Sequence, residues 1–131
     1  MTPAPLNIET ALAACRGDPA LARALIEQYR VGLPAERAKL AEALAAAPPD
    51  WEAVRERAHR LRSGGAYLGA ERIASAAREL ETGILAQNST AALMAAWRAL
   101  ERAFDEFLAA PVEDWEKRPG VVNRLSGGVV P

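Results

Sequence analysis

Apolar residues recur at intervals of three or four positions along most of the chain, which is the spacing of one face of an α-helix. The clearest stripe comprises Val54, Ala58, Leu61 and Gly65. Similar stripes lie on both sides of it, and each is bounded by residues that start or stop helices. The pattern predicts five helices, at about residues 8–15, 19–47, 51–67, 71–87 and 91–110.

Start signals support these boundaries. Asp18 followed by Pro19 combines a capping side chain with proline at the first helical position. Asp50 caps the third helix, and the Asn-Ser-Thr at residues 88–90 supplies the cap of the fifth. Pro34 should bend the second helix, because proline cannot donate a hydrogen bond to the preceding turn.

The same periodicity predicts which residues of the other helices face the core. In order along the chain, they are Ile8, Leu12 and Cys15 in the first helix; Leu21, Leu25, Tyr29, Leu33, Leu40 and Leu44 in the second; Ile73, Ala77, Leu80 and Ile84 in the fourth; and Leu93, Trp97, Leu100, Phe104 and Leu108 in the fifth.

Alanine, leucine, arginine and glutamate dominate the composition, which favours an all-α fold. Long helices with short connections suit an antiparallel four-helix bundle, here with a short additional N-terminal helix. A chain of 131 residues is enough for one domain, which we place at residues 1–110. Residues 111–131 lack a helical period and are expected to form a C-terminal tail, loosely ordered or docked through Trp115.

The net charge of −1 at pH 7 favours neither disorder nor a protein that coats nucleic acid. Cys15 is the single cysteine, which excludes an internal disulfide and a cysteine-rich zinc site. The N-terminus lacks the pattern of a signal peptide, and no stretch approaches the roughly 20 apolar residues that span a bilayer. We therefore expect a soluble, cytoplasmic, monomeric protein with no membrane or nucleic-acid partner.

The one histidine of the chain, His59, lies in the third predicted helix. At 100° per residue it points roughly 130° away from the apolar stripe, so it should be exposed rather than packed in the core. Arg55 lies one turn before it on the same face, and Arg62 and Ser63 lie one turn after it. An exposed histidine on a basic face is either an ordinary surface residue or a reactive one.

The adjacent glycines favour a reactive histidine. A glycine within a helix costs roughly 1 kcal/mol relative to alanine, so two in succession need a reason. Gly65 faces inward, where it would let two helices approach. Gly64 faces outward in this projection and, with Ser63 and Ala66, would leave room for another protein beside His59.

The chemistry available to a lone surface histidine is limited. A hydrolase needs a second converging group, and a metal site needs more ligands than His59 and a distant cysteine supply. A neutral imidazole is nevertheless a good nucleophile towards phosphorus. Nearby guanidinium groups, such as those of Arg62 and Arg55, would stabilise a phosphoryl group on it.

The residues around His59 resemble the motif of a known family. The stretch AHRLRSGGAYLGA at residues 58–70, followed by ARELE at 77–81, is similar to the signature of histidine-containing phosphotransfer (HPt) domains, AHxLKGxxxxLGA and then a Leu-Glu pair on the next helix. Other positions resemble that family's layout over about residues 6–110: Gly17 with Asp18, Tyr29, the leucine spacing from Leu33 to Leu44, and Asp50 with Trp51.

The resemblance implies that His59 accepts the phosphoryl group. Arg62 stands where the family usually has a lysine, and keeps the charge. Ser63 stands where the family usually has a glycine that leaves the imidazole accessible. Gly64, the next residue, would compensate by leaving space there. The resemblance further implies structural roles for the turn at residues 68–70 and for Leu80 and Glu81, which match the later pair.

The function that the resemblance implies is that of a carrier in a two-component phosphorelay. The phosphoryl group would arrive from a receiver-domain aspartate or a histidine kinase and leave to another receiver domain. Since no nucleotide-binding loop is present, we expect no autokinase activity and no cofactor in this chain, with Mg²⁺ in the partner receiver. Since no kinase or receiver segment is attached, we expect a stand-alone, bacterial-type HPt protein.

Two alternatives remain open at the level of sequence. The chain could be a helical adaptor that binds a receiver or kinase without accepting phosphate, and Ser63 in place of glycine favours that hypothesis. It could also be a structural bundle whose basic face binds an acidic partner, in which case binding would depend steeply on salt.

Overall fold

The computed structural model describes residues 4–110. It contains five α-helices: α1 (Ile8–Ala14), α2 (Pro19–Ala45), α3 (Trp51–Leu68), α4 (Glu71–Leu85) and α5 (Thr90–Ala109). No strand occurs within this range, so the all-α prediction is confirmed, and each predicted helix is present with its ends shifted by at most two residues. The predicted tail with Trp115 lies outside the described residues.

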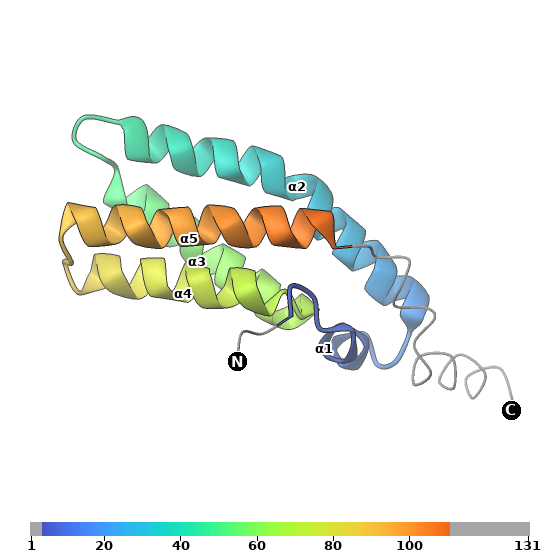
Figure 1. Ribbon diagram of the computed structural model, residues 1–131. Helices are drawn as coiled ribbons and strands as arrows, with labels where there is room; N and C mark the ends of the chain where they lie inside the picture. The colour runs from blue at the N-terminus through green and yellow to red at the C-terminus, as the bar shows by residue number, and fades with distance from the viewer. Residues whose placement is uncertain (1–3, 111–131) are drawn as a thin grey trace, which may run out of the picture.

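Helices α2 to α5 form the expected antiparallel bundle. In Figure 1 they run lengthwise beside one another in alternating directions, with α3 behind α4 and α5. The short α1 lies across one end of the bundle, near the point where α3 passes into α4. Connections of a few residues leave successive helices no alternative to antiparallel packing.

Side-chain caps fix where four of the helices begin, and Asn7 caps α1 by accepting a hydrogen bond from the Thr10 N–H at 3.3 Å. Asp18, Asp50 and Ser89 each accept a hydrogen bond from the backbone N–H three residues later, at 3.2, 3.1 and 3.1 Å. Pro34 lies inside α2, which remains one helix but changes direction along its length (Figure 1), as predicted.

The turn between α3 and α4 requires a glycine. Gly69 has φ +81°, the left-handed conformation that commonly ends helices, and a Cβ built on it would lie 2.2 Å from the carbonyl oxygen of Asn7. The Asn7 N–H donates to the Gly69 carbonyl at 2.7 Å, and the Tyr67 hydroxyl donates to the Ala14 carbonyl at 3.0 Å. These bonds hold α1 and the segment before it against the end of α3.

The core is built mainly from the stripes that the sequence predicts. In α3 all four residues of the stripe from Val54 to Gly65 are buried. In the first half of α2 the prediction is wrong in part, because Leu21 is 46% exposed and Ala22 and Ile26 are buried instead. Steps of four residues turn by 400°, so the predicted run drifts by about 40° per step around the helix, from an exposed Leu21 to a buried Leu33.

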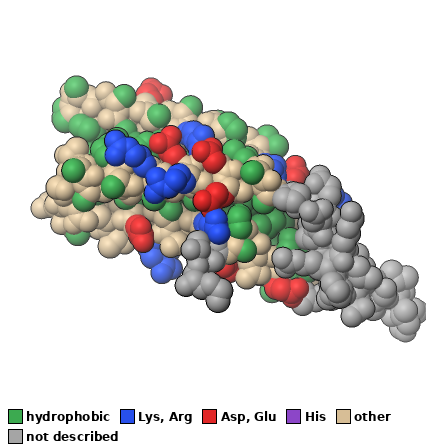
Figure 2. Space-filling view, in the orientation of Figure 1, with side chains coloured by type: hydrophobic (Ala, Val, Ile, Leu, Met, Phe, Trp, Pro, Cys, Tyr) green, Lys and Arg blue, Asp and Glu red, His purple; other side chains and the backbone are tan. Residues whose placement is uncertain are grey.

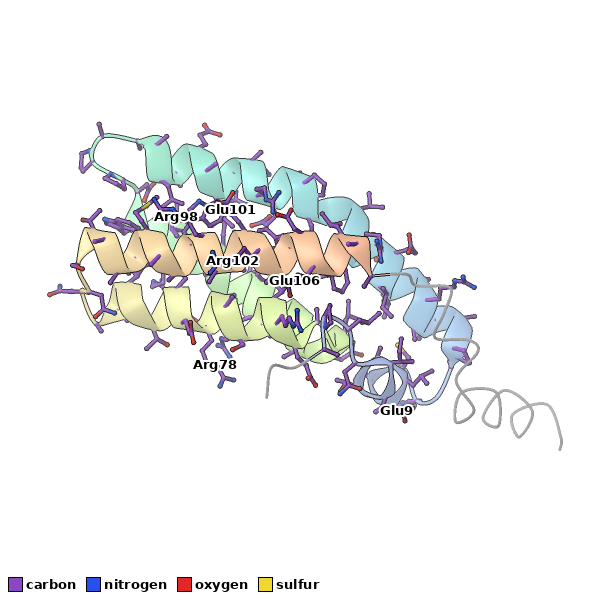
Figure 3. All side chains as sticks on the ribbon, in the orientation of Figure 1. Glu9, Arg78, Arg98, Glu101, Arg102 and Glu106 are labelled. Carbon is purple, nitrogen blue, oxygen red and sulfur yellow. The ribbon has the colours of Figure 1, made fainter. Side chains whose placement is uncertain are left out.

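Helices α4 and α5 present a face of mixed charge. Figure 2 shows arginine and acidic side chains interspersed over it, and Figure 3 locates several of them, among them Arg78, Arg98 and Arg102. Arg72 of α4 forms an ion pair with Glu106 of α5. This face is therefore no uniformly basic surface. Within residues 4–110 no helix has the length and apolar character needed to cross a membrane.

Candidate functional site

His59 lies on the outer surface of α3, and its side chain is 51% exposed. This agrees with the direction deduced from the apolar stripe, since Val54, Ala58 and Leu61 point into the core. The geometry excludes a packed core histidine. It leaves the imidazole accessible to a second protein.

The imidazole is not isolated, however, because Glu81 of α4 contacts it. The Nδ1 atom of His59 lies 2.7 Å from Oε2 of Glu81, while Oε1 of Glu81 accepts a hydrogen bond at 3.0 Å from Nε of Arg62. The Glu81 side chain is only 11% exposed. A buried carboxylate with two such partners is fixed in position, and it links α4 to the outer face of α3.

This contact determines which imidazole nitrogen carries the proton. An ionised carboxylate can only accept, so the 2.7 Å contact requires a proton on Nδ1 of His59. The Arg62 Nη2 atom, 3.1 Å from the same nitrogen, then contributes charge rather than a second hydrogen bond, because Nδ1 has no free lone pair. The neutral ring therefore has its lone pair on Nε2, which hydrogen-bonds to no residue between 4 and 110.

The ionised state of Glu81 is favoured by these contacts. Burial alone would raise the pKa of the Glu81 carboxyl, but the hydrogen bonds from His59 and Arg62 outweigh it, and its pKa lies below the ordinary value. The carboxylate therefore remains an acceptor for Nδ1 at neutral pH.

Of the two arginines predicted beside His59, the structure brings only Arg62 to the imidazole. The predicted support from Arg55 is not seen, because its guanidinium turns back by one turn to Glu52, with Nε 3.2 Å from Oε2. The hydrogen bond from Arg55 lowers the pKa of the Glu52 carboxyl. Residues three apart in a helix are neighbours on its surface, which favours this ion pair, while Arg55 still interacts electrostatically with Glu81.

The small residues beyond His59 have different surroundings. Ser63 and Ala66 are exposed, whereas Gly65 is buried, as expected. Gly64 does not simply face outward: it is half-buried, and a Cβ on it would lie 3.2 Å from the Tyr29 ring. The predicted outward direction of Gly64 is therefore corrected, because Tyr29 of α2 packs close to it, whereas its role in leaving room for a partner stays a prediction.

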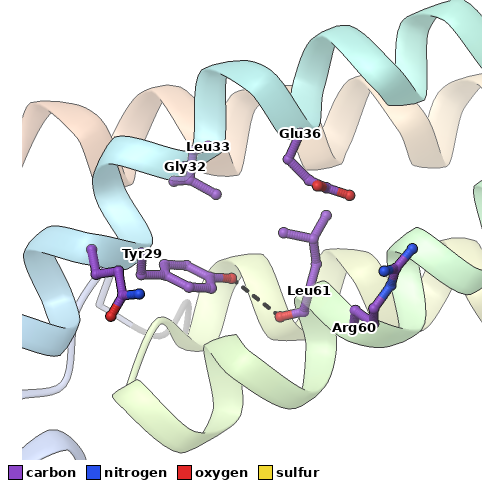
Figure 4. Close-up of a pocket in the computed structure, with 7 residues that line it drawn as sticks. Tyr29, Gly32, Leu33, Glu36, Arg60 and Leu61 are labelled. Atoms are coloured by element: carbon purple, nitrogen blue, oxygen red, sulfur yellow. Dashed lines mark hydrogen bonds between the residues drawn. The ribbon is translucent and has the colours of Figure 1, made fainter.

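Tyr29 of α2 separates two hollows along the α2–α3 surface. Its hydroxyl donates to the Leu61 carbonyl at 3.1 Å, and burial raises the pKa of the phenol. On one side is a largely apolar groove of about 470 Å³, lined by Leu25, Gln28, Tyr29, Ser63, Gly64, Tyr67 and Leu68. On the other side is a hollow of about 220 Å³ (Figure 4), lined by Gln28, Tyr29, Gly32, Leu33, Glu36, Arg60 and Leu61.

Sequence reasoning missed two of these features. The family resemblance implies only a structural role for Glu81. An acid beside Leu80 at the edge of the apolar stripe of α4 nevertheless indicates a buried carboxylate in need of a partner. The groove had no sequence signal, because it depends on where α2 crosses α3.

Cys15 and possible metal ligands are the other groups in the described part of the chain that could carry chemistry. Cys15 is buried and free, and its burial together with nearby Asp18 raises the pKa of the thiol. Within residues 4–110 no group of three or more His, Cys, Asp or Glu side chains is placed to hold a metal ion.

The fold and site together define a class of protein, a helical bundle that presents one histidine on its surface beside an arginine and a buried carboxylate. A family model for the Hpt domain matches residues 24–110, which is most of the chain. The chain therefore belongs to the Hpt domain family, whose members are phosphoryl carriers in phosphorelay signalling and act with receiver or kinase domains. No curated protein and no solved structure matches it.

Proposed function

We propose that His59 is the phospho-accepting residue and that the chain carries a phosphoryl group between a receiver aspartate, or a histidine kinase, and a second receiver domain. The observation that carries the proposal is the contact between Nδ1 of His59 and the buried Glu81 carboxylate at 2.7 Å. It keeps the Nε2 lone pair available on an imidazole that is half exposed.

In the proposed step the Nε2 atom of His59 attacks the phosphorus of an aspartyl phosphate on the partner. The N–P bond forms as the bond between phosphorus and the aspartate oxygen breaks, and the carboxylate leaves with the electron pair. The ring becomes positively charged, and the Nδ1 proton stays hydrogen-bonded to Glu81, which stabilises that charge. The reverse reaction delivers the phosphoryl group to the next aspartate.

Arg62 supplies the positive charge nearest to the imidazole in this proposal. Its Nη2 atom is 3.1 Å from Nδ1 of His59, so its positive charge lies beside the ring that would carry the phosphoryl group. Because Nε of Arg62 is already engaged by Glu81, the side chain is held in place before the partner binds. The Mg²⁺ that neutralises the phosphoryl oxygens would come with the receiver.

The apolar groove beside His59 is the proposed contact surface for the receiver. Ser63 lies one turn from His59 and lines the groove, so a protein that covers the imidazole also covers the groove. Exposed apolar surface at Tyr67, which is 53% exposed, favours such a contact. Gly64 also lines the groove, and we propose that Arg55 and Ala66, on the same helix as His59, adjoin the partner as well.

The test is transfer of labelled phosphate from a phosphorylated receiver domain. We expect the wild-type protein to acquire acid-labile label and His59→Gln to acquire none, because the amide cannot form the N–P bond. Circular dichroism should show that the variant keeps its helices. Equal labelling of the His59→Gln variant would overturn the assignment of His59.

The adaptor hypothesis is favoured by one feature, the exposed hydroxyl of Ser63 where a glycine is usual. It predicts that a receiver binds the wild-type protein without loss of its own phosphate, and that His59→Gln leaves this binding unchanged. Titration calorimetry alongside the labelling experiment separates the two functions.

A further inference from the structure

Helix α3 carries four arginines, and three of them are neutralised by a carboxylate. The ion pairs are Arg55 with Glu52, Arg57 with Glu36 and Arg62 with Glu81. The fourth is Arg60, the residue next to His59 in the chain. It is exposed and forms no ion pair with any residue between 4 and 110.

Two acids lie near Arg60 on helices α2 and α3, and neither is paired with it in the described structure. Glu36 lines the same hollow (Figure 4), but both of its oxygens accept from Nη1 of Arg57, at 3.0 and 3.2 Å. Glu56, one turn earlier in α3, is exposed and forms no ion pair with Arg60 in the described structure. The hollow therefore carries at its edge a guanidinium that no carboxylate contacts, while the Glu56 carboxylate lies one turn earlier in the same helix.

This charge lies on the surface that a partner of His59 would cover. Gln28 and Tyr29 line both the hollow and the apolar groove, so the two adjoin each other along α2 and α3. The surface is apolar at Leu25 and Tyr67 and becomes basic at Arg60. An occupant that matches it has apolar side chains at one end and an acidic side chain at the other.

We infer that Arg60 is a specificity-determining residue, which pairs with an aspartate or glutamate on the segment of the receiver that fills the groove. The inference rests on the proposed function, since it names the chemistry of the partner at that same site. An ion pair at the edge of an interface affects the association rate and the choice of partner more than the chemical step. Arg60 is thus assigned to recognition, whereas Arg62 acts on the phosphoryl group.

The experiment compares charge reversal at Arg60 with charge reversal at a matched position. Arg60→Glu and Arg78→Glu both alter an exposed arginine on a helix, and Arg78 of α4 (Figure 3) has no acidic partner among the described residues. Phosphotransfer from a panel of purified, phosphorylated receiver domains is measured at low and high salt. Circular dichroism confirms that each variant is folded, and Arg60→Gln serves as a milder change.

We expect Arg60→Glu to lower kcat/KM about tenfold with the receivers that serve the wild-type protein, and Arg60→Gln to lower it by less. The loss should shrink at high salt, and Arg78→Glu should change the rate less than twofold. Reversing the matching acid of the receiver to lysine should restore transfer to Arg60→Glu.

The inference is overturned if Arg60→Glu and Arg60→Gln transfer at the wild-type rate with every receiver, or if Arg78→Glu loses as much as Arg60→Glu. Failure of the proposed function would look different. In that case the wild-type protein would itself acquire no phosphate, either from receivers or from phosphoramidate, a small donor that needs no docking surface.

Discussion

At the scale of single residues, the reactivity proposed for His59 depends on its contact with Glu81, a side chain 22 positions later in the chain. Glu81 is ionised, largely buried and shared between the imidazole and Arg62. Without it the ring could exchange its proton between the two nitrogens, and Arg62 would lose the group that holds it. The carboxylate is thus a positioning residue for both neighbours.

Glu81→Gln should make the protein less stable at neutral pH, by about 1–3 kcal/mol, because a largely buried charged acceptor with two hydrogen-bond partners is lost. The pH dependence gives the sharper result. The pKa of Glu81 is below its ordinary value of 4.5. The stability that the ionised Glu81 carboxylate contributes is therefore fully present above pH 4.5 and is lost as the pH falls through the folded-state pKa. Urea unfolding between pH 7 and 3 should therefore show that the free energy of unfolding falls less on acidification in Glu81→Gln than in the wild-type protein.

Glu79→Gln is the matched control, because Glu79 is exposed on the same helix. Its free energy of unfolding should fall on acidification as much as that of the wild-type protein. Phosphate uptake from phosphoramidate should also be slower in Glu81→Gln and unchanged in Glu79→Gln. Identical pH profiles for the two variants would show that His59 and Arg62 do not stabilise the ionised form of Glu81.

At the scale of elements, the packing of α2 against α3 determines the role of each glycine near His59. A Cβ on Gly65 would lie 3.1 Å from the Tyr29 hydroxyl and 3.2 Å from the Ala70 carbonyl oxygen. The tyrosine can shift, but the carbonyl belongs to the turn that starts α4. Gly65 is therefore needed for the close approach of neighbouring elements, at the cost of helix propensity.

Gly65→Ala should lower the free energy of unfolding by about 1–2 kcal/mol, because overpacking outweighs the gain in propensity. Gly32→Ala in α2 provides the comparison, since a Cβ there meets nothing within 4 Å. That substitution should stabilise the protein by up to about 1 kcal/mol. Thermal and urea unfolding of both variants measure the difference, and a stabilised Gly65→Ala would contradict the packing described.

At the scale of the whole molecule, two arginines of α2 attach it to α5. Arg30 donates to the carbonyls of Leu108 and Ala110, both at 2.7 Å. Arg37 donates to the Glu101 carbonyl at 2.8 Å and to Asp105 at 2.9 Å. Each guanidinium also lies over a phenylalanine ring of α5, with centroid distances of 5.6 and 5.4 Å. These contacts fix α2, and so determine the shape of the groove between α2 and α3.

Arg37→Met should lower the free energy of unfolding by about 1–3 kcal/mol, because the apolar stem is kept while the hydrogen bonds to α5 are lost. Arg98→Met is the control, since Arg98 is exposed on α5 (Figure 3) and has no hydrogen-bond or ion-pair partner among the described residues. It should change stability by less than about 0.5 kcal/mol. Equal stability of the two variants in urea would show that Arg37 does not attach α2.

The sequence by itself determined the helices, their caps, the bend at Pro34 and the exposure of His59. Each of these follows from interactions within a few residues, such as a cap at Asp50 or the spacing of Val54, Ala58 and Leu61. The motif around His59 also sufficed to indicate the family, which the match over residues 24–110 establishes.

Only the tertiary structure decided which side chains meet. The contact of Glu81 with His59, the Tyr29 ring over Gly64 and the pairing of Arg57 with Glu36 join residues from different helices. Helical periodicity gives the direction of a side chain but not the axial position or crossing of the neighbouring helix. For that reason the sequence indicated a histidine on a basic face, and the fold decided that Arg62 would be held beside it while Arg60 was left without an acidic partner.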